Sequence, residues 1–306
     1  MAMIVDEEGK NNYLKAGKIA GKALLYAAKS IKPGMPIREL LDNAEEKIFS
    51  LGGNLGFPAQ AALNNIAAHQ CPTEEEGLVF NEEDMVKLDF GAEYEGFIGD
   101  TATTVYLGND SEKKKIVEAS KKALQEAMKL IKPGTPVNEI GRKIDEVISS
   151  YDLNPIRNLS GHGLGLYEIH DAPGIPNYDN GDDTELEEGE MIAVEPFATN
   201  GVGKVKNFGQ ATVFAKMIEK GTRNPFAREA LKIIDEFEGL PFSQTLLEKK
   251  LGVGKTRIAL AELKKLEILN EFPALREVSD GIVSQHEHSF LVGKKTIITT
   301  LVDDDE

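Results

Sequence analysis

The stretch KALLYAAKSIKPGMPIRELLDNAEEKIFS, from Lys22 to Ser50, has a second copy in the same chain. It aligns without gaps to KALQEAMKLIKPGTPVNEIGRKIDEVISS, from Lys122 to Ser150. Each copy predicts two helices separated by a Lys-Pro-Gly turn, in which the glycine ends the first helix and Pro36 or Pro136 resumes the chain. A repeat of this length predicts two half-domains related by pseudo-symmetry.

Strand-like segments follow each helix pair. The clearest is a hairpin formed by DMVKLDFG (84–91) and FIGDTATTVYLG (97–108), which are rich in Val, Thr and aromatic residues. GEMIAVEPFAT (189–199) and GIVSQHEHSFLVGKKTIITTL (281–301) predict further strands, the second as another hairpin. The sequence thus predicts an α/β domain formed by residues 1–223 and 275–306, with halves of about 1–110 and 111–223.

Residues 224–274 differ from this frame because their apolar spacing is helical. We expect a helical, winged-helix-like insertion that serves as a wall or interaction element and not as a DNA reader. The run Gly252 to Thr256 does not form a phosphate-binding loop, because Lys249 stands where the first glycine is required.

Composition restricts the class of protein. The 306 residues are 41% hydrophobic, enough for a substantial core, and no run approaches the roughly 18 apolar residues of a membrane helix. The N-terminal residues lack a secretory signal, and a single cysteine, Cys71, is typical of a reducing compartment, so we expect a cytoplasmic protein. The net charge of -16 argues against a nucleic-acid partner, which requires a basic face.

Two aspartates of the predicted hairpin point to a cation. A turn through Glu93 to Gly96 places Asp89 directly opposite Asp100. Like charges that face each other on a ladder destabilise it unless a cation lies between them. An error of one residue in the register would instead turn one aspartate to the other face of the sheet.

Two glutamates and the histidines complete a predicted metal site. Glu195 follows the apolar run 191–194, and taken alone it is better explained as an acid at an exposed strand end. Glu287 interrupts a strand on the face shared with Gln285 and Ser289. All five histidines lie in the same segments: His69, His162, His170, His286 and His288. Glycines 161, 163 and 165 around His162 are expected to leave room for a ligand or metal. Four carboxylates and one imidazole suit divalent Mn, Fe, Co or Zn.

The same segments resemble the type II methionine aminopeptidases over nearly the whole chain. The resemblance rests on FPAQAALNNIAAH, KLDFG, IGDTATT, PIRNLSGHGLGLYEIH, VEPF and QHEHS, which occur in the family's order and spacing. It implies the duplicated pita-bread fold, in agreement with the internal repeat. The type II assignment rests on the insertion, which separates Glu195 from Glu287 by 92 positions.

The resemblance also implies a role for each site residue. Asp89 is expected to chelate one of two divalent metal ions, His162 and Glu195 to bind the other, and Asp100 and Glu287 to bridge them. His69 and His170 are expected to handle the substrate amide, with His170 stabilising the tetrahedral intermediate. Phe57, Ile169 and Phe197 are expected to line the methionine side-chain pocket. His286 departs from the family, which has a bulky apolar residue there, and is expected to point away from Glu287.

The implied activity is the removal of initiator methionine from nascent polypeptides. Two metals would share a bridging hydroxide that attacks the first peptide carbonyl, with Glu195 shuttling the proton. We expect a monomer with no membrane partner, and the ribosome is a possible partner through the nascent chain. Two alternatives remain open at this point: a proline-specific peptidase of the same fold, and a non-catalytic ribosome- or RNA-associated binding protein.

Overall fold

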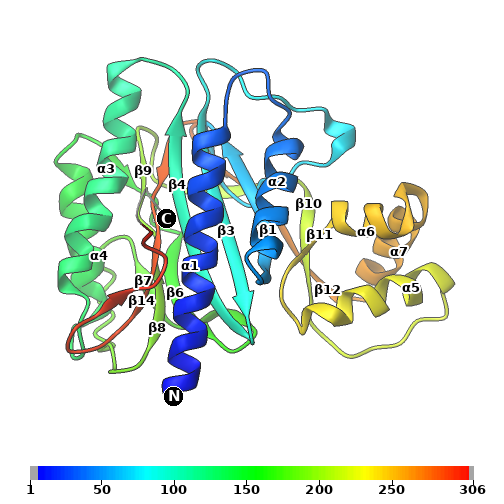
Figure 1. The fold of residues 1–306 in the computed structure, drawn as a ribbon. Helices are drawn as coiled ribbons and strands as arrows, with labels where there is room; N and C mark the ends of the chain where they lie inside the picture. Colours follow the sequence, from blue (N-terminus) through cyan, green and yellow to red (C-terminus); the bar gives the residue numbers. More distant parts are fainter. Residues whose placement is uncertain (1–5, 303–306) are drawn as a thin grey trace.

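The computed structural model describes residues 6–302, and the ends of the predicted catalytic domain, 1–5 and 303–306, lie outside this range. The first half packs two helices on a three-stranded antiparallel sheet (Figure 1). The helices are α1 (Glu7–Ser30) and α2 (Ile37–Ser50), and the sheet has the order β1 (Asn54–Leu63), β3 (Met85–Tyr94), β4 (Phe97–Tyr106). Their buried faces form one hydrophobic core that includes Leu24, Leu40, Ile48, Leu88 and Phe90.

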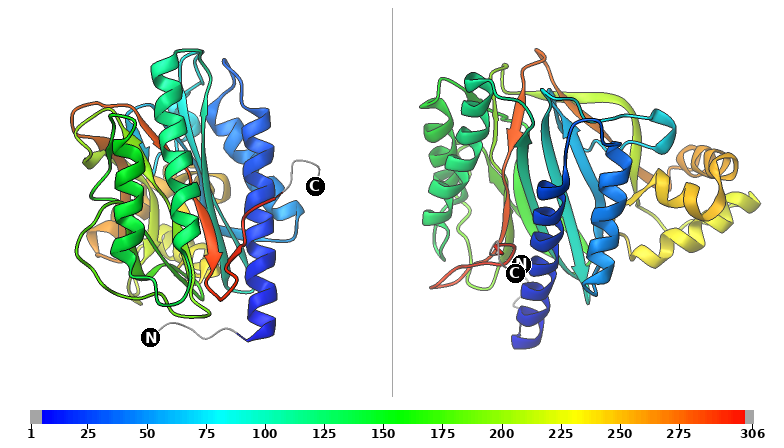
Figure 2. Two further views of the ribbon diagram at one scale, coloured as in Figure 1. Left: turned by 90° about the vertical axis from the view of Figure 1, so that its left-hand side faces the viewer. Right: turned by 45° about the horizontal axis from the view of Figure 1, so that its top comes forward.

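The second half repeats this arrangement with its own core. Here α3 (Ser111–Ala127) and α4 (Val137–Ser149) cover a five-stranded sheet, and the core between them includes Leu124, Ile140, Ile144, Ile192 and Phe290. The sheet has the order β15 (Ile297–Ile298), β14 (His288–Leu291), β8 (Met191–Val194), β6 (Ser160–Gly165), β7 (Glu168–Pro176). Figure 2 shows the two helix pairs side by side and the C-terminal segment beside α1. The predicted duplication of two helices followed by strands is therefore confirmed.

The Lys-Pro-Gly turns have the same backbone conformation in both halves. Gly34 and Gly134 have φ angles of 82° and 81°, and the amide of the next residue donates to the carbonyl of Lys32 or Lys132. Proline followed by a glycine with positive φ is the pattern of a type II turn. The expectation that this glycine ends the first helix is wrong, because α1 ends at Ser30 and α3 at Ala127, followed by the 3₁₀ turn Met128–Leu130.

The hairpin of β3 and β4 has a tighter turn than the sequence predicted. Tyr94 pairs with Phe97, so only Glu95 and Gly96 form the loop, and both have positive φ. Such a two-residue turn matches the right-handed twist of the strands. Asp89 consequently lies opposite Ala102 and Asp100 opposite Gly91, so the predicted direct pairing of the aspartates is wrong. Because the shift in register is an even number of residues, both aspartates keep the same face.

Two further small sheets complete the fold, and the second contains the strands that flank the inserted helices. One has the order β13 (Val283–Gln285), β9 (Phe197–Thr199), β5 (Asn154–Pro155). The other has the order β11 (Phe242–Ser243), β10 (Val205–Lys216), β12 (Leu269–Glu277), β2 (Ile66–Ala68). The remaining short elements are the 3₁₀ turns Glu74–Glu76 and Asp235–Phe237.

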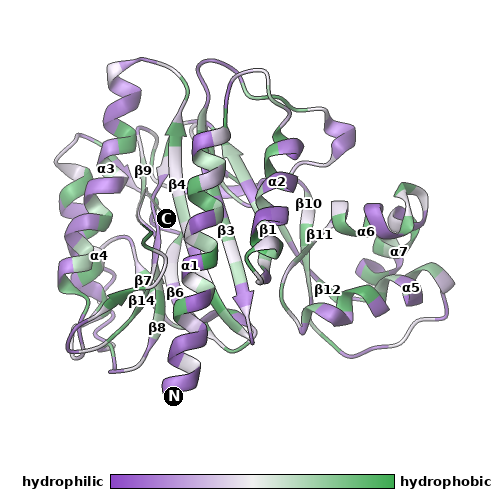
Figure 3. Cartoon of the chain, viewed as in Figure 1, coloured by the Kyte–Doolittle hydropathy of each residue, from purple (hydrophilic) through white to green (hydrophobic). Residues whose placement is uncertain are grey.

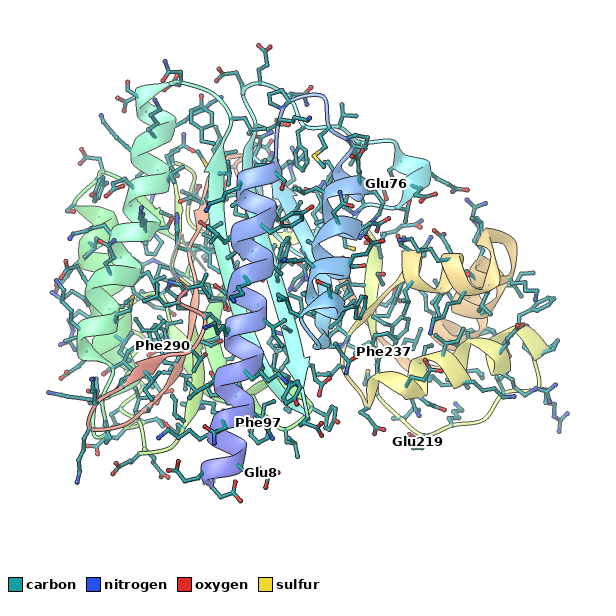
Figure 4. All side chains as sticks on the ribbon, viewed as in Figure 1. Glu8, Glu76, Phe97, Glu219, Phe237 and Phe290 are labelled. Atoms are coloured by element: carbon teal, nitrogen blue, oxygen red, sulfur yellow. The ribbon has the colours of Figure 1, made fainter. Side chains whose placement is uncertain are left out.

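Three helices extend from the strands β10 and β12 on the right of Figure 1. They are α5 (Pro225–Ile234), α6 (Gln244–Leu251) and α7 (Val253–Lys265), and they share a core with β10 that includes Phe214, Ala230, Phe242 and Leu263. Figure 3 shows both hydrophilic and hydrophobic residues along these helices, as expected for helices with one face on a core. Phe237 lies where this region meets the rest of the molecule (Figure 4). It is partly buried and packs against the cluster that contains Phe57, Phe97 and Leu240.

None of the helices within residues 6–302 combines the length and the apolar character needed to cross a membrane.

Candidate metal centre and substrate pocket

Glu195 and Glu287 lie at breaks in two neighbouring strands. The chain leaves β8 at Val194 and enters β9 at Phe197, and it leaves β13 at Gln285 and enters β14 at His288. Because β8 pairs with β14 and β9 pairs with β13, the two breaks lie side by side. Both glutamates therefore emerge from the same place between two sheets, where the strand pairing of the backbone is interrupted.

Backbone and side-chain hydrogen bonds join this place to the hairpin that carries the aspartates. The amide of Glu287 donates to the carbonyl of Ala102 at 2.9 Å. The hydroxyl of Ser289 donates to the carbonyl of Asp100 at 2.7 Å, and the Asp100 amide donates back to the hydroxyl at 2.8 Å. Thr104 makes the same kind of double contact with the backbone of Gln285. These contacts fix the first half of the molecule against the last strands and hold Asp100 beside Glu287.

His162 brings an imidazole to the carboxylates from strand β6. Its Nδ1 lies 3.1 Å from the carbonyl of Gly163, so Nδ1 donates its proton there and the Nε2 lone pair is free. Nε2 lies 3.6 Å from Oδ2 of Asp100 and 3.8 Å from Oε1 of Glu195. Burial lowers the pKa of His162 to about 3, with a further contribution from His170, so the ring is neutral as a metal ligand requires.

The glycines around His162 serve packing and do not provide space for a ligand. A Cβ atom on Gly161 would lie 2.2 Å from the carbonyl oxygen of Ala193, and one on Gly163 would lie 2.0 Å from that of Ala172. The expectation of free space is therefore wrong, because the neighbouring strands fill it. Because Gly161 lets β6 lie close to β8, His162 lies next to Glu195.

All five predicted ligands line one cavity of about 210 Å³. Burial raises the pKa of Asp89 to about 7, opposed by a hydrogen bond from Gln285. Burial, and then the neighbouring carboxylates, raise the pKa values of Asp100, Glu195 and Glu287 well above their usual range. Oδ1 of Asp89 and Oδ1 of Asp100 are buried and have no hydrogen-bond partner among residues 6–302.

This donor set fits a divalent metal. Ligand atoms of Asp100, His162 and Glu287 lie within 4.8 Å of one another. Buried carboxylates of like charge with unpaired oxygens are costly, and a bound cation removes both the repulsion and the unmet hydrogen bonding. Oxygen ligands with one imidazole suit hard and borderline divalent ions.

Gln285 is a site residue that the sequence did not identify. Its side-chain amide lies 3.4 Å from Oδ2 of Asp89, 3.2 Å from Oε2 of Glu195 and 3.4 Å from Oε2 of Glu287. It therefore contacts three of the predicted ligands at once. Gln285 lies two residues before Glu287, and the other two carboxylates that it contacts come from different strands, which only the folded chain brings together.

The residues predicted to bind substrate surround the same cavity. Its walls include Phe57, His69, Ile169, His170 and Phe197, as expected. The His170 and His162 rings meet edge to face at 4.7 Å between centroids. His69 has a φ of 62°, a left-handed conformation that is uncommon outside glycine and is often found at functional sites. Burial lowers the pKa of His69 to about 4 and also lowers that of His170, so both rings are neutral.

Other residues complete the walls and were not predicted individually. They are Gln60, Ala68, Asn158, Leu159, Ser160, Val213, Pro241 and Phe272. Pro241 and Phe272 lie in the region between 224 and 274, so the insertion does form a wall of the pocket. His286 points away as expected: its Nδ1 contacts the Ser120 hydroxyl at 2.8 Å on the far side of the strand.

Comparisons with known proteins agree with this geometry. Residues 11–223 match the model of metallopeptidase family M24. The chain is 41% identical to the methionine aminopeptidase of Archaeoglobus fulgidus, over 96% of this chain and 100% of that protein. It is 39% identical to that of Thermococcus onnurineus, over 94% and 98%. A crystal structure of methionine aminopeptidase from Thermotoga maritima shares the fold, with a TM-score of 0.73 and 24% identity over 99% of this chain and all of that one.

The match to the family model covers more than half of the chain, and the archaeal relatives match it almost from end to end. Members of this family are metal-dependent hydrolases, and the cavity described above holds a donor set that fits divalent ions. The chain belongs to the M24 metallopeptidases and, within them, to the methionine aminopeptidases.

Proposed function

We propose that this protein is a type II methionine aminopeptidase that removes the initiator methionine from nascent polypeptides. The observation that carries the proposal is the convergence of Asp89, Asp100, His162, Glu195 and Glu287 on a cavity that Phe57, Ile169 and Phe197 also line. An apolar wall of phenylalanine and isoleucine accommodates an unbranched, polarisable methionine side chain. The type II assignment is supported by the three helices inserted between β10 and β12.

The site residues have distinct proposed roles. Asp89 would hold one divalent ion, His162 and Glu195 the second, and Asp100 and Glu287 both. Bound ions of this kind supply Lewis acidity and an activated water at neutral pH. Which of Co, Mn, Fe and Zn is bound depends on the availability of each metal in the cell as well as on the ligands.

The remaining chemistry belongs to side chains of the chain itself. Glu195, held beside His162, would accept the proton of the attacking water and pass it to the leaving amine. His170 and His69 would bind the carbonyl oxygen and the amide of the first peptide bond. A neutral imidazole carries one N–H group, which can donate a hydrogen bond to an oxygen on which negative charge develops. Phe57, Ile169 and Phe197 would hold the methionine side chain and exclude water from it.

The proposed setting is the cytoplasm, where nascent chains carry an initiator methionine, with the protein acting as a monomer. Ribosome association remains a proposal that co-sedimentation would test.

Metal-dependent hydrolysis of defined peptides tests the activity. The protein, stripped of metal and reloaded with Mn²⁺ or Co²⁺, is expected to release methionine from Met-Ala-Ser and to leave Ala-Pro intact. Cleavage of Ala-Pro alone would make the protein a proline-specific peptidase. Failure to bind metal or to cleave either peptide would favour a binding protein built on this fold.

A further inference from the structure

Gln60 is a buried polar residue beside the proposed metal centre. It lies in β1 and is the Cα partner of Asp89 in β3, so both side chains project from the same face of the sheet. The residue is only 5% exposed and lines the cavity together with Phe57 and Ile169. Its amide is therefore a buried polar group on the cavity wall, on the strand next to that of Asp89.

The side-chain oxygen of Gln60 has no hydrogen-bond donor. Oε1 is buried, and no donor among residues 6–302 lies within hydrogen-bonding distance of it. Oε1 of Gln285, whose amide nitrogen faces the proposed ligands, is unpaired as well. Two other amides nearby, those of Asn158 and Gln70, are satisfied by the protein itself. Oδ1 of Asn158 accepts from the amide of Val205, and Oε1 of Gln70 accepts from the amide of Leu63. Because buried acceptors are nearly always paired, an unpaired one on a cavity wall points to a donor that arrives with a ligand.

The substrate offers one group that meets this requirement beside Asp89. A methionine side chain carries a thioether, which accepts weakly and donates nothing. The free α-amino group carries N–H donors and is attracted to the carboxylate side of the cavity. Gln60 adjoins that side, because its strand partner Asp89 is one of the proposed ligands.

We propose that Oε1 of Gln60 accepts a hydrogen bond from the α-amino group of the substrate and thereby selects peptides with a free N-terminus. This inference rests on the proposed function. It makes Gln60 a specificity-determining residue, distinct from the side chains that hold metal or handle the amide. It also means that the free enzyme keeps an unmet acceptor that substrate binding satisfies.

Replacement of Gln60 by methionine separates this role from a structural one. The Gln60→Met variant keeps the length of the side chain and removes the acceptor. A residue that only stabilised the fold would lose stability on replacement. Removal of an unpaired buried acceptor is expected to leave the unfolding temperature unchanged or to raise it.

The experiment uses the metal-loaded enzyme and two ligands that differ in the amino group. KM and kcat are measured with Met-Ala-Ser, and the inhibition constant is measured for its des-amino analogue, 4-(methylthio)butanoyl-Ala-Ser. In Gln60→Met we expect KM for Met-Ala-Ser to rise roughly tenfold, the loss of one hydrogen bond to a charged or strongly polar group. The inhibition constant of the analogue is expected to stay within about twofold, since it never made that contact.

Gln70→Met is the matched control, because the Gln70 carbonyl accepts from the amide of Ala61, next to Gln60, while its side chain is paired within the protein. It is expected to lower the unfolding temperature and to leave KM unchanged. An equal weakening of both ligands in Gln60→Met, no change for either, or a fall in its unfolding temperature would overturn the role of Gln60. A wild-type enzyme that does not hydrolyse Met-Ala-Ser would contradict the proposed function itself.

Discussion

At the scale of single residues, the buried carboxylates make the stability of the metal-free protein depend on pH. Burial raises the pKa of Asp89 to about 7, and burial followed by the charge of Asp89 raises the pKa of Asp100 well above its usual range. A carboxyl whose pKa is higher in the folded than in the unfolded state stabilises the fold below its unfolded pKa, near 4, and that contribution is lost as pH rises through the folded pKa.

The first prediction follows for protein freed of metal with a chelator. Its unfolding temperature is expected to fall on the order of 5 °C between about pH 5 and pH 8, because the buried carboxylates must ionise. Metal-loaded protein is expected to lose far less, since the ions balance the charge.

Asp100→Asn removes one of the like charges and is expected to raise the unfolding temperature of the metal-free protein at pH 8. Differential scanning fluorimetry with and without Mn²⁺ measures both effects, and a metal-free protein that is more stable at pH 8 than at pH 5 would contradict the prediction.

The second prediction concerns His170, whose ring lies against His162 across the cavity. His170→Ala is expected to lower kcat on Met-Ala-Ser by roughly 10²-fold, the usual loss when one donor to a developing oxyanion is removed. Metal content, measured by inductively coupled plasma mass spectrometry, should remain that of the wild type, because His170 is not among the proposed ligands. His162→Ala is the contrasting variant and should lose metal together with activity. A loss of metal in His170→Ala would mean that the ring belongs to the metal site.

At the scale of the elements, different glycines are required for different structural reasons, which the sequence does not distinguish. Gly34 has a φ of 82° in a type II turn, and a Cβ added to it would meet no atom within 4 Å. Gly99 in β4 lies so close to α1 that an added Cβ would be 2.4 Å from the Cα of Gly17. The first requires only a backbone conformation, whereas the second requires the absence of a side chain.

The third prediction is therefore a contrast between two alanine substitutions. Gly34→Ala is expected to lower the free energy of unfolding by roughly 1–2 kcal/mol, the cost of a left-handed conformation for a residue with a Cβ. Gly99→Ala must push α1 away from the sheet and is expected to cost several times more, or to prevent folding. Urea denaturation followed by circular dichroism measures both. Equal losses for the two variants would show that α1 adapts more easily than its packing indicates.

The same elements show which parts of the site a sequence can reveal. The aspartates were found because they face each other on a predicted hairpin, Glu195 because it ends an apolar run, and Glu287 because it interrupts a strand. The loop has two residues, Glu95 and Gly96, and not the four that were predicted, but both aspartates still share a face of the sheet. Gln60 and Gln285 were missed as functional residues because an amide within a strand has many structural explanations. Val213 and Phe272 come from β10 and β12, and only long-range pairing of these strands with the rest brings them to the cavity.

At the scale of the whole molecule, the inserted helices are separable from the metal centre but not from the pocket. All five proposed ligands lie outside the segment 217–268, whereas Pro241 lies within it and Phe272 follows it on β12. The helices have a core of their own with β10. They meet the first half through ion pairs such as Lys249 with Asp42, at 2.7 Å, and Arg257 with Glu75. Such exposed pairs contribute little, so orientation depends mainly on the shared strands.

The last prediction uses the strand register to remove the helices cleanly. Lys216 of β10 is paired with Leu269 of β12, so an Asn-Gly turn can replace residues 217–268 and close the two strands as a hairpin. The replacement exposes Phe214, which is therefore changed to threonine in the same variant and, as a control, in the full-length chain.

The shortened protein is expected to keep its metal content, because every proposed ligand remains. Its KM for Met-Ala-Ser is expected to rise roughly tenfold or more, since the pocket loses the wall around Pro241. Isothermal titration with Mn²⁺ and steady-state kinetics separate the two effects. Loss of metal binding in the shortened protein alone would show that the inserted helices support the metal centre, and an unchanged KM would show that they do not form a working wall of the pocket.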